Sequence, residues 1–387
     1  MNSIGSPYSF HVHQFLVAAT ASLDAAIADI ADLVSVESPS RDVQSVTASA
    51  HAVANLIRRE TGLVAELVDS PVGPHVLVRA AARPAVMFLG HHDTVHQLGT
   101  LERRPFVNDA GTLRGPGVFD MKAGIVQAVH AVRIMREVGI DPAHVAMLFT
   151  ADEEVGSKTS RGLVEEVARS VDAVLVLEPS ADGGTLKTAR KGTGTFEVVI
   201  SGRASHAGLE PEKGINALVE LAHQVQRISG FGNPAVGTTV TPTVASAGTT
   251  DNTVPERATI LVDARVVTSE EKQRVESLMN SLTPVLEGAS IAVSGGLHRP
   301  PMHESMSTSL FEVARAVAGE IDGRDIAGIA VGGGSDGNFT AAIGVPTLDG
   351  LGAVGGGAHG ESEHVVSGTI PFRTALVAGI AARIIAG

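Results

Sequence analysis

Three apolar runs in this chain end directly in acidic or imidazole side chains, and this pattern constrains the fold more than any other feature. The runs are Val86–Leu89, Val145–Thr150 and Ala173–Leu177. Each has the length and composition of a buried strand, and the stretch from Ile125 to about Val138 has a helical pattern. Alternation of strands with helices predicts an α/β sheet. Functional side chains are expected where such strands end, at the edge of the sheet.

The first apolar run leads into Gly90-His91-His92-Asp93. In an extended segment, residues i and i+2 point to the same side, so His91 and Asp93 are predicted to lie together while His92 faces elsewhere. A carboxylate beside a metal-binding imidazole fixes its tautomer and raises its basicity, which makes Asp93 a candidate partner for His91. A turn histidine with a capping aspartate is the alternative interpretation.

The second and third runs lead into carboxylates. Asp152-Glu153-Glu154 follows one of them, and Glu178 follows the other. Adjacent carboxylates at a partly buried strand end raise one another's pKa unless cations neutralise them, which indicates a metal site. Two neighbouring glutamates also permit two roles, one as a metal ligand and one as a base. A solvated acidic turn is the alternative.

Asp120 and His359 lie in glycine-rich segments and are weaker candidates for metal ligands. Asp120 stands just before a helical pattern, and His359 follows Gly355-Gly356-Gly357-Ala358. Glycine allows the backbone to approach a ligand closely. Taken alone, Asp120 could equally cap a helix, and His359 could be an ordinary loop histidine.

Taken together, these segments resemble the cocatalytic-zinc family of aminoacylases, acetylornithine deacetylases, succinyl-diaminopimelate desuccinylases and glutamate carboxypeptidases. The resemblance extends over nearly the whole chain from about residue 30 onward, and the pattern is most similar to that of the glutamate carboxypeptidases. The motifs that carry it are HHDTV (91–95), GPGVFDMKAG (115–124), TADEEVGS (150–157), EP (178–179), ASHAG (204–208) and AHGESEHV (358–365).

The resemblance implies a centre of two divalent metal ions. Asp120 would bridge the ions, His91 and Glu178 would complete one site, and Glu154 and His359 would complete the other. Ligands with oxygen and nitrogen atoms and without thiolate fit Zn²⁺, although Co²⁺ or Mn²⁺ could substitute.

The resemblance also implies a mechanism. Glu153 would be the general base and Asp93 the acid that orients a ligand. A hydroxide bridging the two ions would attack an amide carbonyl, and Glu153 would pass the proton to the leaving amine. In the family the peptide bond after the bridging aspartate is typically cis, so a cis bond is expected at Asp120–Met121.

Three polar residues match positions that bind substrate in the family. The resemblance implies that His206 stabilises the oxyanion, and in relatives this histidine comes from the lid of a second subunit. Asn252 and Arg299 match residues that bind the substrate's carboxylate, and Arg265 is a further candidate. A guanidinium can grip a carboxylate with two parallel hydrogen bonds, so a substrate with a free carboxylate is expected.

The length of 387 residues supports two domains. The predicted division is a zinc-exopeptidase-like catalytic domain over 1–188 and 302–387, with a mixed sheet flanked by helices, and an inserted α+β lid or dimerisation domain over 189–301. The segments expected in the insertion are strands at Thr195–Ile200, Thr238–Ala247 and Arg257–Val267 and helices at Ile215–Ile228 and Glu270–Leu282.

Two further expectations concern single segments of these domains. The strand Arg257–Val267 is expected at an exposed edge, where two lids could pair into a homodimer. An amphipathic stretch, Phe15–Val34, is expected to form the opening helix of the catalytic domain.

Composition sets limits on partners and location. The chain has no cysteine, which excludes disulfides and thiolate ligands. A formal charge of −13 without a basic cluster argues against nucleic acid and anionic membranes as partners. No secretory signal is evident in Met1–Phe15, so a cytoplasmic enzyme is expected. The expected partner is a small-molecule or short-peptide substrate.

The sequence therefore predicts a dinuclear-metal hydrolase that cleaves an amide bond, either as a glutamate carboxypeptidase-like exopeptidase or as an N-acyl-amino-acid deacylase. Two alternatives stay open. A dimetal phosphoesterase could use a similar pair of cations, and a non-catalytic binding protein could have kept the fold. His92 and His96 could tune specificity or lie on the surface.

Overall fold

The computed structural model describes residues 11–387, which pack into two compact units. The larger unit contains the chain up to Ala189 together with Glu304–Ala330 and Ser335–Gly387. The smaller unit contains Arg190–His303 and Val331–Gly334. The sequence had placed Val331–Gly334 in the catalytic domain. These residues instead pack with the smaller unit, where the Gly332 and Gly333 carbonyls accept hydrogen bonds from arginines.

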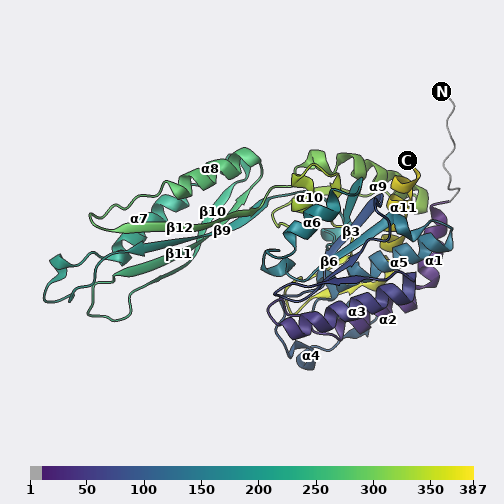
Figure 1. The fold of residues 1–387 in the computed structure, drawn as a ribbon, viewed down its shortest axis with the longest axis horizontal. Coiled ribbons are helices and arrows are strands. Elements are labelled where there is room, and N and C mark those ends of the chain that lie inside the picture. Colours follow the sequence, from purple (N-terminus) through teal and green to yellow (C-terminus); the bar gives the residue numbers. More distant parts are fainter. Residues whose placement is uncertain (1–10) are drawn as a thin grey trace. The chain divides into compact units, whose positions relative to one another are not determined.

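The larger unit is built on a mixed six-stranded sheet with the order β1-β2-β6-β3-β7-β14 (Figure 1). β3 lies parallel to both β6 and β7, and β14 lies parallel to β7, while β1 and β2 are antiparallel additions. The mixed sheet predicted from the sequence is confirmed. The strands are β1 (Glu66–Val68), β2 (His75–Val78), β3 (Val86–His91), β6 (Val145–Thr150), β7 (Ala173–Val176) and β14 (Thr347–Leu348).

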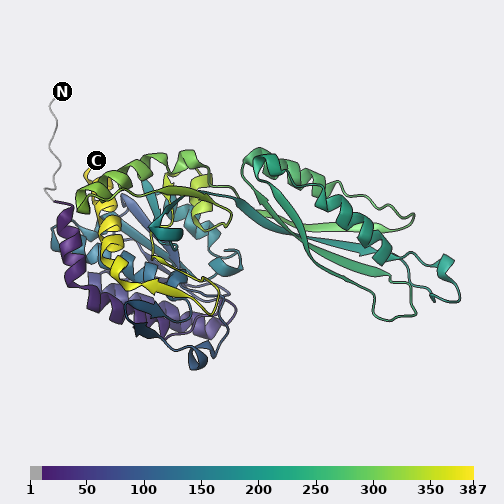
Figure 2. The same ribbon diagram turned by 180° about the vertical axis from the view of Figure 1, so that it is seen from behind.

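Alternate residues of β3 pack on opposite faces of this sheet, which explains why the apolar run is uninterrupted. Val86 and Phe88 belong to the larger core, and Met87 and Leu89 belong to a separate core on the other face. The first core is covered by α1 (His13–Ala21), α2 (Leu23–Val34), α3 (Val43–Thr61), α5 (Ala123–Glu137), α9 (Thr308–Asp322) and α11 (Ile370–Ala386). The second is covered by α6 (Arg161–Ala168) and α10 (Gly337–Ala342), so helices flank both faces (Figures 1 and 2).

The opening helix predicted over Phe15–Val34 is two helices. The chain breaks at Ser22, which separates α1 from α2. The Ser22 hydroxyl donates to the Ala18 carbonyl at 3.0 Å. A serine side chain that bonds the backbone in this way competes with the regular helical ladder.

A small four-stranded sheet in the larger unit has the order β15-β16-β5-β4 and joins segments that are far apart in sequence. Its strands are β4 (Val107–Asp109), β5 (Thr112–Arg114), β15 (Gly355–Gly356) and β16 (His364–Val366), and α4 (Thr100–Arg103) precedes them. Because β5 pairs with β16, the turn η1 (Val118–Lys122) is brought to the loop between β15 and β16. A separate two-stranded sheet is formed by β8 (Leu186–Arg190) and β13 (Gly328–Val331).

The smaller unit is an antiparallel sheet with the order β10-β11-β9-β12, covered on one face by two helices (Figure 1). Its elements are β9 (Gly192–Ser201), α7 (Ala217–Ser229), β10 (Thr239–Ala247), β11 (Arg257–Val266), α8 (Ser269–Asn280) and β12 (Ser290–Arg299). The prediction that Arg257–Val267 lies at an exposed edge is wrong, because β11 pairs on both sides. The edges are β10 and β12.

One described helix, α11 with its preceding turn, is long and apolar enough to cross a membrane by length and composition (Ser367–Ala386). However, 72% of this window is buried inside the larger unit. Its side chains pack with those of α1, α5 and α9 in the main core. The apolar character of α11 is therefore accounted for by its central position in the fold.

Candidate metal centre and active site

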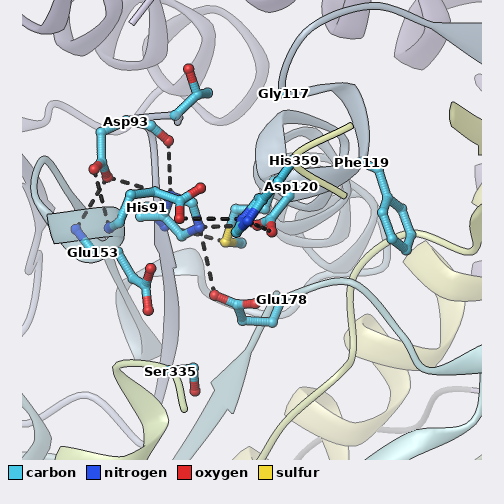
Figure 3. A network of polar contacts seen from close by, with 12 residues as sticks. His91, Asp93, Gly117, Phe119, Asp120, Glu153, Glu178, Ser335 and His359 are labelled. Carbon is cyan, nitrogen blue, oxygen red and sulfur yellow. Dashed lines mark hydrogen bonds and ion pairs between the residues drawn. The ribbon is translucent and has the colours of Figure 1, made fainter. Parts of the chain in front are cut away.

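His91 is the last residue of β3 and lies at the centre of a cluster of carboxylates (Figure 3). Its Nδ1 donates to the Asp93 carbonyl at 2.9 Å, and the Asp93 carboxylate lies 3.4 Å from the same nitrogen. Since a carbonyl can only accept, Nδ1 carries a proton. The other ring nitrogen, Nε2, lies 3.2 Å from Asp120 Oδ1 and 3.6 Å from Glu178 Oε1. The ring thus directs one nitrogen toward its orienting partner and the other toward two carboxylates, as a metal-binding histidine does.

Asp120 directs its two oxygens toward two different imidazoles. Its Oδ1 lies near His91, and its Oδ2 lies 3.3 Å from His359 Nε2. The same His359 nitrogen lies 3.3 Å from Glu154 Oε2. The peptide bond Asp120–Met121 is cis, as the resemblance implied. Asp120 therefore lies between the two halves of the cluster.

Asp93 fixes the acidic turn that follows β6. The side chain is fully buried. Its Oδ1 accepts from the Glu153 amide at 3.2 Å, and its Oδ2 accepts from the Glu154 amide at 3.3 Å. Asp93 therefore contacts both His91 and the backbone of the two glutamates. The sequence predicted the contact with His91 but not the contact with the turn.

The electrostatics of the cluster favour positive charge. Hydrogen bonds to Asp120 and Glu154 raise the pKa of His359 to about 10. Burial opposes protonation of His91, but hydrogen bonds to Asp120 and Asp93 outweigh it and raise the pKa of this imidazole. The same contacts lower the pKa of the Asp120 carboxyl against the opposing effect of burial. Carboxylates that hold two imidazoles in their charged form have the electrostatic character of a cation site.

The donor atoms present fit divalent metal ions. Two sets of side chains each bring one ligand atom within 4.8 Å of the others, namely His91 with Asp120 and Glu154, and His91 with Glu153 and Glu178. Glu154 Oε1 is buried and has no hydrogen-bond partner among the described residues. A buried carboxylate oxygen without a donor is costly unless a cation approaches it. Oxygen and imidazole ligands without thiolate suit zinc and similar ions.

The three predicted substrate residues lie in the smaller unit, at two ends of its sheet. His206 is exposed, and its Nδ1 accepts from the amides of Gly208 and Leu209, both at 3.1 Å. The backbone carbonyl of Asn252 accepts a hydrogen bond at 2.9 Å from the amide of Ala207, the residue after His206. Arg299 is buried and pairs with the start of β9, whereas His206 follows the end of β9. The structure therefore brings His206 and Asn252 together but places Arg299 at the other end of β9.

Arg265, the further candidate, is engaged within the smaller unit. Its Nε lies 3.1 Å from Asp263 Oδ1, and its Nη1 donates to the Gly332 carbonyl at 3.0 Å. The guanidinium is thus paired with a neighbouring carboxylate in the same strand.

Two histidines that the sequence left open are placed inside the larger unit. His92 is fully buried, its Nε2 bonds the Pro74 carbonyl at 3.0 Å, and burial lowers its pKa to about 4. His96 contacts Glu363, a buried acid that sequence reasoning did not select. The available signal was the position of Glu363, four residues after His359 in the same loop.

The profile of Peptidase family M20/M25/M40 matches residues 87–383 of this chain. The chain is 30% identical over 380 residues to carboxypeptidase G2 of Pseudomonas sp. (strain RS-16), which covers 93% of this chain and 89% of that protein. It is also 27% identical over 321 residues to succinyl-diaminopimelate desuccinylase of Stutzerimonas stutzeri (strain A1501), covering 77% and 82% of the two chains.

Solved structures share the fold over nearly the full length. Aminopeptidase PepT from Bacillus cereus ATCC 10987 aligns with a TM-score of 0.73 at 21% identity, covering 94% of this chain and 98% of that one. The metallo-carboxypeptidase Sso-CP2 from Sulfolobus solfataricus aligns with a TM-score of 0.74 at 14% identity, covering 93% and 99%. At these identities the likeness concerns the fold alone.

Proposed function

Because this chain belongs to Peptidase family M20/M25/M40, we propose that its carboxylate cluster hydrolyses an amide bond in a small substrate with a free carboxylate. The family that the motifs resembled is thereby confirmed, and the protein is a metal-dependent hydrolase that acts on C–N bonds. The proposed reaction is that of a glutamate carboxypeptidase-like exopeptidase or an N-acyl-amino-acid deacylase. The observation that carries the proposal is the position of Asp120 between two imidazoles.

In this proposal two divalent cations, assigned as Zn²⁺, would be shared among five side chains. His91 and Glu178 would hold one ion, Glu154 and His359 would hold the other, and Asp120 would contact both. Bound cations of this kind supply Lewis acidity that polarises a carbonyl and makes water more acidic. Asp93 would keep the His91 imidazole in the tautomer that leaves Nε2 available, which its contacts at Nδ1 support.

Glu153 is proposed as the general base. Its backbone amide is fixed by Asp93, and its side chain belongs to one of the sets that bring ligand atoms within 4.8 Å of His91. The Glu153 carboxylate would take a proton from the attacking water and deliver it to the leaving amine. The adjacent Glu154 contacts His359 instead. The two neighbouring glutamates are therefore proposed to have different roles, Glu153 as the base and Glu154 as a metal ligand.

Arg299 and Asn252 are proposed to bind the substrate's free carboxylate, with Asn252, which lies beside His206 at the other end of β9, supplied by a second copy of the chain. Arg299 is 6% exposed, and a guanidinium that is held in place loses little freedom when it grips a carboxylate. Replacing Arg299 by Ala is expected to raise KM for substrates with a free carboxylate and to affect amidated analogues less. An unchanged preference between the two kinds of substrate would assign carboxylate binding to another residue.

His206 is proposed as the oxyanion donor, acting in a homodimer formed through the smaller unit. Because its Nδ1 accepts two backbone N–H groups, the neutral ring carries its proton on Nε2 and can donate it. Its location at the end of β9 away from Arg299 supports action on the centre of a second copy.

Mixing two inactive variants tests this arrangement. A His206→Ala protein and a Glu153→Gln protein are expected to regain activity together, because each mixed dimer then contains one centre with both residues. Absence of recovery, with subunit exchange shown by a labelled chain, would restrict His206 to its own active site.

The two alternatives that the sequence left open are a dimetal phosphoesterase and a non-catalytic binding protein. Phosphoester hydrolysis is not the chemistry of the family to which the chain belongs, which acts on C–N bonds. A binding protein without catalysis would have no need of Glu153, which is retained beside Glu154 at the cluster.

The main experiment is a substrate screen on protein reconstituted with Zn²⁺. N-acyl amino acids and dipeptides ending in acidic, basic or aromatic residues are compared with a phosphate ester. Glu153→Gln serves as the matched variant and is expected to keep its metal while kcat falls by about 10²- to 10⁴-fold. Near-normal turnover of Glu153→Gln at full metal occupancy would contradict the assignment of the base.

A further inference from the structure

A buried carboxylate, that of Glu363, holds the backbone that carries Asp120. Its Oε1 accepts hydrogen bonds from the amides of Phe119 at 2.9 Å and Asp120 at 3.0 Å, and its Oε2 accepts one from the Gly117 amide at 2.9 Å. His96 Nε2 lies 2.6 Å from the same Oε2. Since Glu363 is 1% exposed, these donors replace water around its charge.

The direction of these hydrogen bonds follows from Arg104. Its Nη2 lies 3.0 Å from His96 Nδ1, and a guanidinium can only donate, so Nδ1 accepts. The proton of the neutral His96 ring is then on Nε2, directed at Glu363. Arg104 also donates from Nη1 to the Gly360 carbonyl at 2.8 Å. Arg104, His96 and Glu363 therefore form a continuous set of contacts, which we call the Glu363 network.

The Glu363 network connects the two segments that supply Asp120 and His359. Gly360 directly follows His359, and Glu363 directly precedes β16. β16 pairs with β5, and the chain leaves β5 toward Asp120. One loop therefore supplies the His359 imidazole and also holds the backbone beneath the carboxylate that faces it.

We propose that Glu363 is a positioning residue for the metal centre and that His96 and Arg104 orient it. The inference rests on the proposed function, because it takes Asp120 as the ligand that two cations share. A displaced Asp120 backbone would move both carboxylate oxygens away from both imidazoles at once. Replacing a residue that orients a ligand typically lowers metal affinity by about 10- to 100-fold.

The test compares two buried glutamates. Glu363→Gln keeps the shape of the side chain but replaces one carboxylate oxygen by an amide NH₂. This group cannot accept hydrogen bonds from the N–H donors that surround the carboxylate. Glu220→Gln is the matched control, because Glu220 is also buried and accepts from the amides of Val285 and Leu286, but it lies in the smaller unit. Zn²⁺ dissociation constants are measured by competition with a chelator, and denaturation of the metal-free proteins reports stability.

Glu363→Gln is expected to raise the dissociation constant of at least one Zn²⁺ by about 10- to 100-fold. Glu220→Gln is expected to leave both constants unchanged, although both variants lose stability. A folded Glu363→Gln protein that binds both ions as the wild type does would overturn the inference, because the contacts of Glu363 would then serve stability alone.

Variants of His96 cover the case in which Glu363→Gln does not fold. His96→Ala removes the donor to Glu363, whereas His96→Gln can still accept from Arg104 and donate to Glu363. Zn²⁺ affinity is expected to fall in His96→Ala and to recover largely in His96→Gln. Equal affinities in wild type, His96→Ala and His96→Gln would contradict the orienting role of His96.

Zn²⁺ affinity is measured without substrate, which separates this inference from the proposed function. A wild type that binds two Zn²⁺ ions but hydrolyses no N-acyl amino acid or peptide contradicts the proposed function only. A wild type that hydrolyses such substrates, with Glu363→Gln and both His96 variants unaffected in Zn²⁺ affinity, contradicts this inference only.

Discussion

Two clusters of histidine and acidic residues in the larger unit have similar compositions and different sources of positive charge. At the candidate metal centre, the ion-pair partners of Asp120 and Glu154 among residues 11–387 are the imidazoles of His91 and His359. These rings are cationic only when protonated, so the positive charge that faces Asp120 and Glu154 depends on protons or metal ions.

The second cluster joins α2, α3 and α5. Asp29, Glu60 and His130 also bring one ligand atom each within 4.8 Å of one another. Here, however, Arg59 pairs with both Asp29 and Glu60, and Arg133 Nη1 lies 3.4 Å from Glu60 Oε2. Arginine stays charged at all ordinary pH values. This cluster therefore contains its own cations.

The comparison shows that proximity of ligand atoms does not by itself identify a metal site. What distinguishes the two clusters is the identity of the groups that balance the carboxylates. Arginines occupy the positions around Asp29 and Glu60 that a metal ion would need. The following predictions test whether this difference in charge balance separates a functional site from a structural one.

Removal of metal is expected to have the largest effect. A chelator should abolish turnover, and added Zn²⁺ should restore it. A ligand that binds only the folded state at a hundred times its dissociation constant stabilises that state by about 3 kcal/mol, so the free energy of unfolding should fall by a similar amount on chelation. Denaturant titrations with and without Zn²⁺ measure this. Equal stability in both would mean that the folded protein does not bind Zn²⁺ in preference to the unfolded chain, which would contradict the proposed metal centre.

Asp29→Asn is expected to have an intermediate effect that is confined to stability. The change removes the charged partner of the buried His130, whose Nε2 lies 2.8 Å from Asp29 Oδ2. Arg59 loses one of its two carboxylate partners and keeps Glu60. Because Arg59 is half exposed, we expect a loss of about 1–3 kcal/mol in the free energy of unfolding. Zn²⁺ content and kcat should match the wild type. A lower metal content in Asp29→Asn would show that the second cluster also binds an ion.

Glu60→Gln is expected to have the smallest effect. Its closest partner, Arg59, is half exposed, and Arg133 lies 3.4 Å away; exposed ion pairs contribute about 1 kcal/mol or less each. Urea denaturation of this variant beside Asp29→Asn measures the difference. A loss as large as that of Asp29→Asn would mean that the two acids act as one buried network.

The larger unit was the easier part to predict from the sequence. Val86–Leu89 and Val145–Thr150 are strands of the parallel core because their uninterrupted apolar character leaves no polar face for solvent. The spacing of His91 and Asp93 predicted their contact, since this depends only on the period of an extended chain.

The smaller unit was harder to predict because its strands are half exposed. The strand Ser290–Arg299 was not predicted, and it contains Gly295 and Gly296, both with positive φ, beside a shift in register. Glycine weakens the pattern by which a strand is recognised. Without β12, the order of the sheet could not be derived, and β11 was assigned to an edge that β10 occupies.

The sequence alone determined which ligand types are present, the order in which the chain delivers them and the strands that end in them. These follow from local periodicity and from the chemistry of single side chains. Only the tertiary structure decided which groups balance each charge, namely Arg59 beside Asp29, His359 beside Glu154, and three backbone amides with His96 around Glu363. Such contacts join segments that are distant in the chain, and their geometry is set by the packing of whole strands and helices.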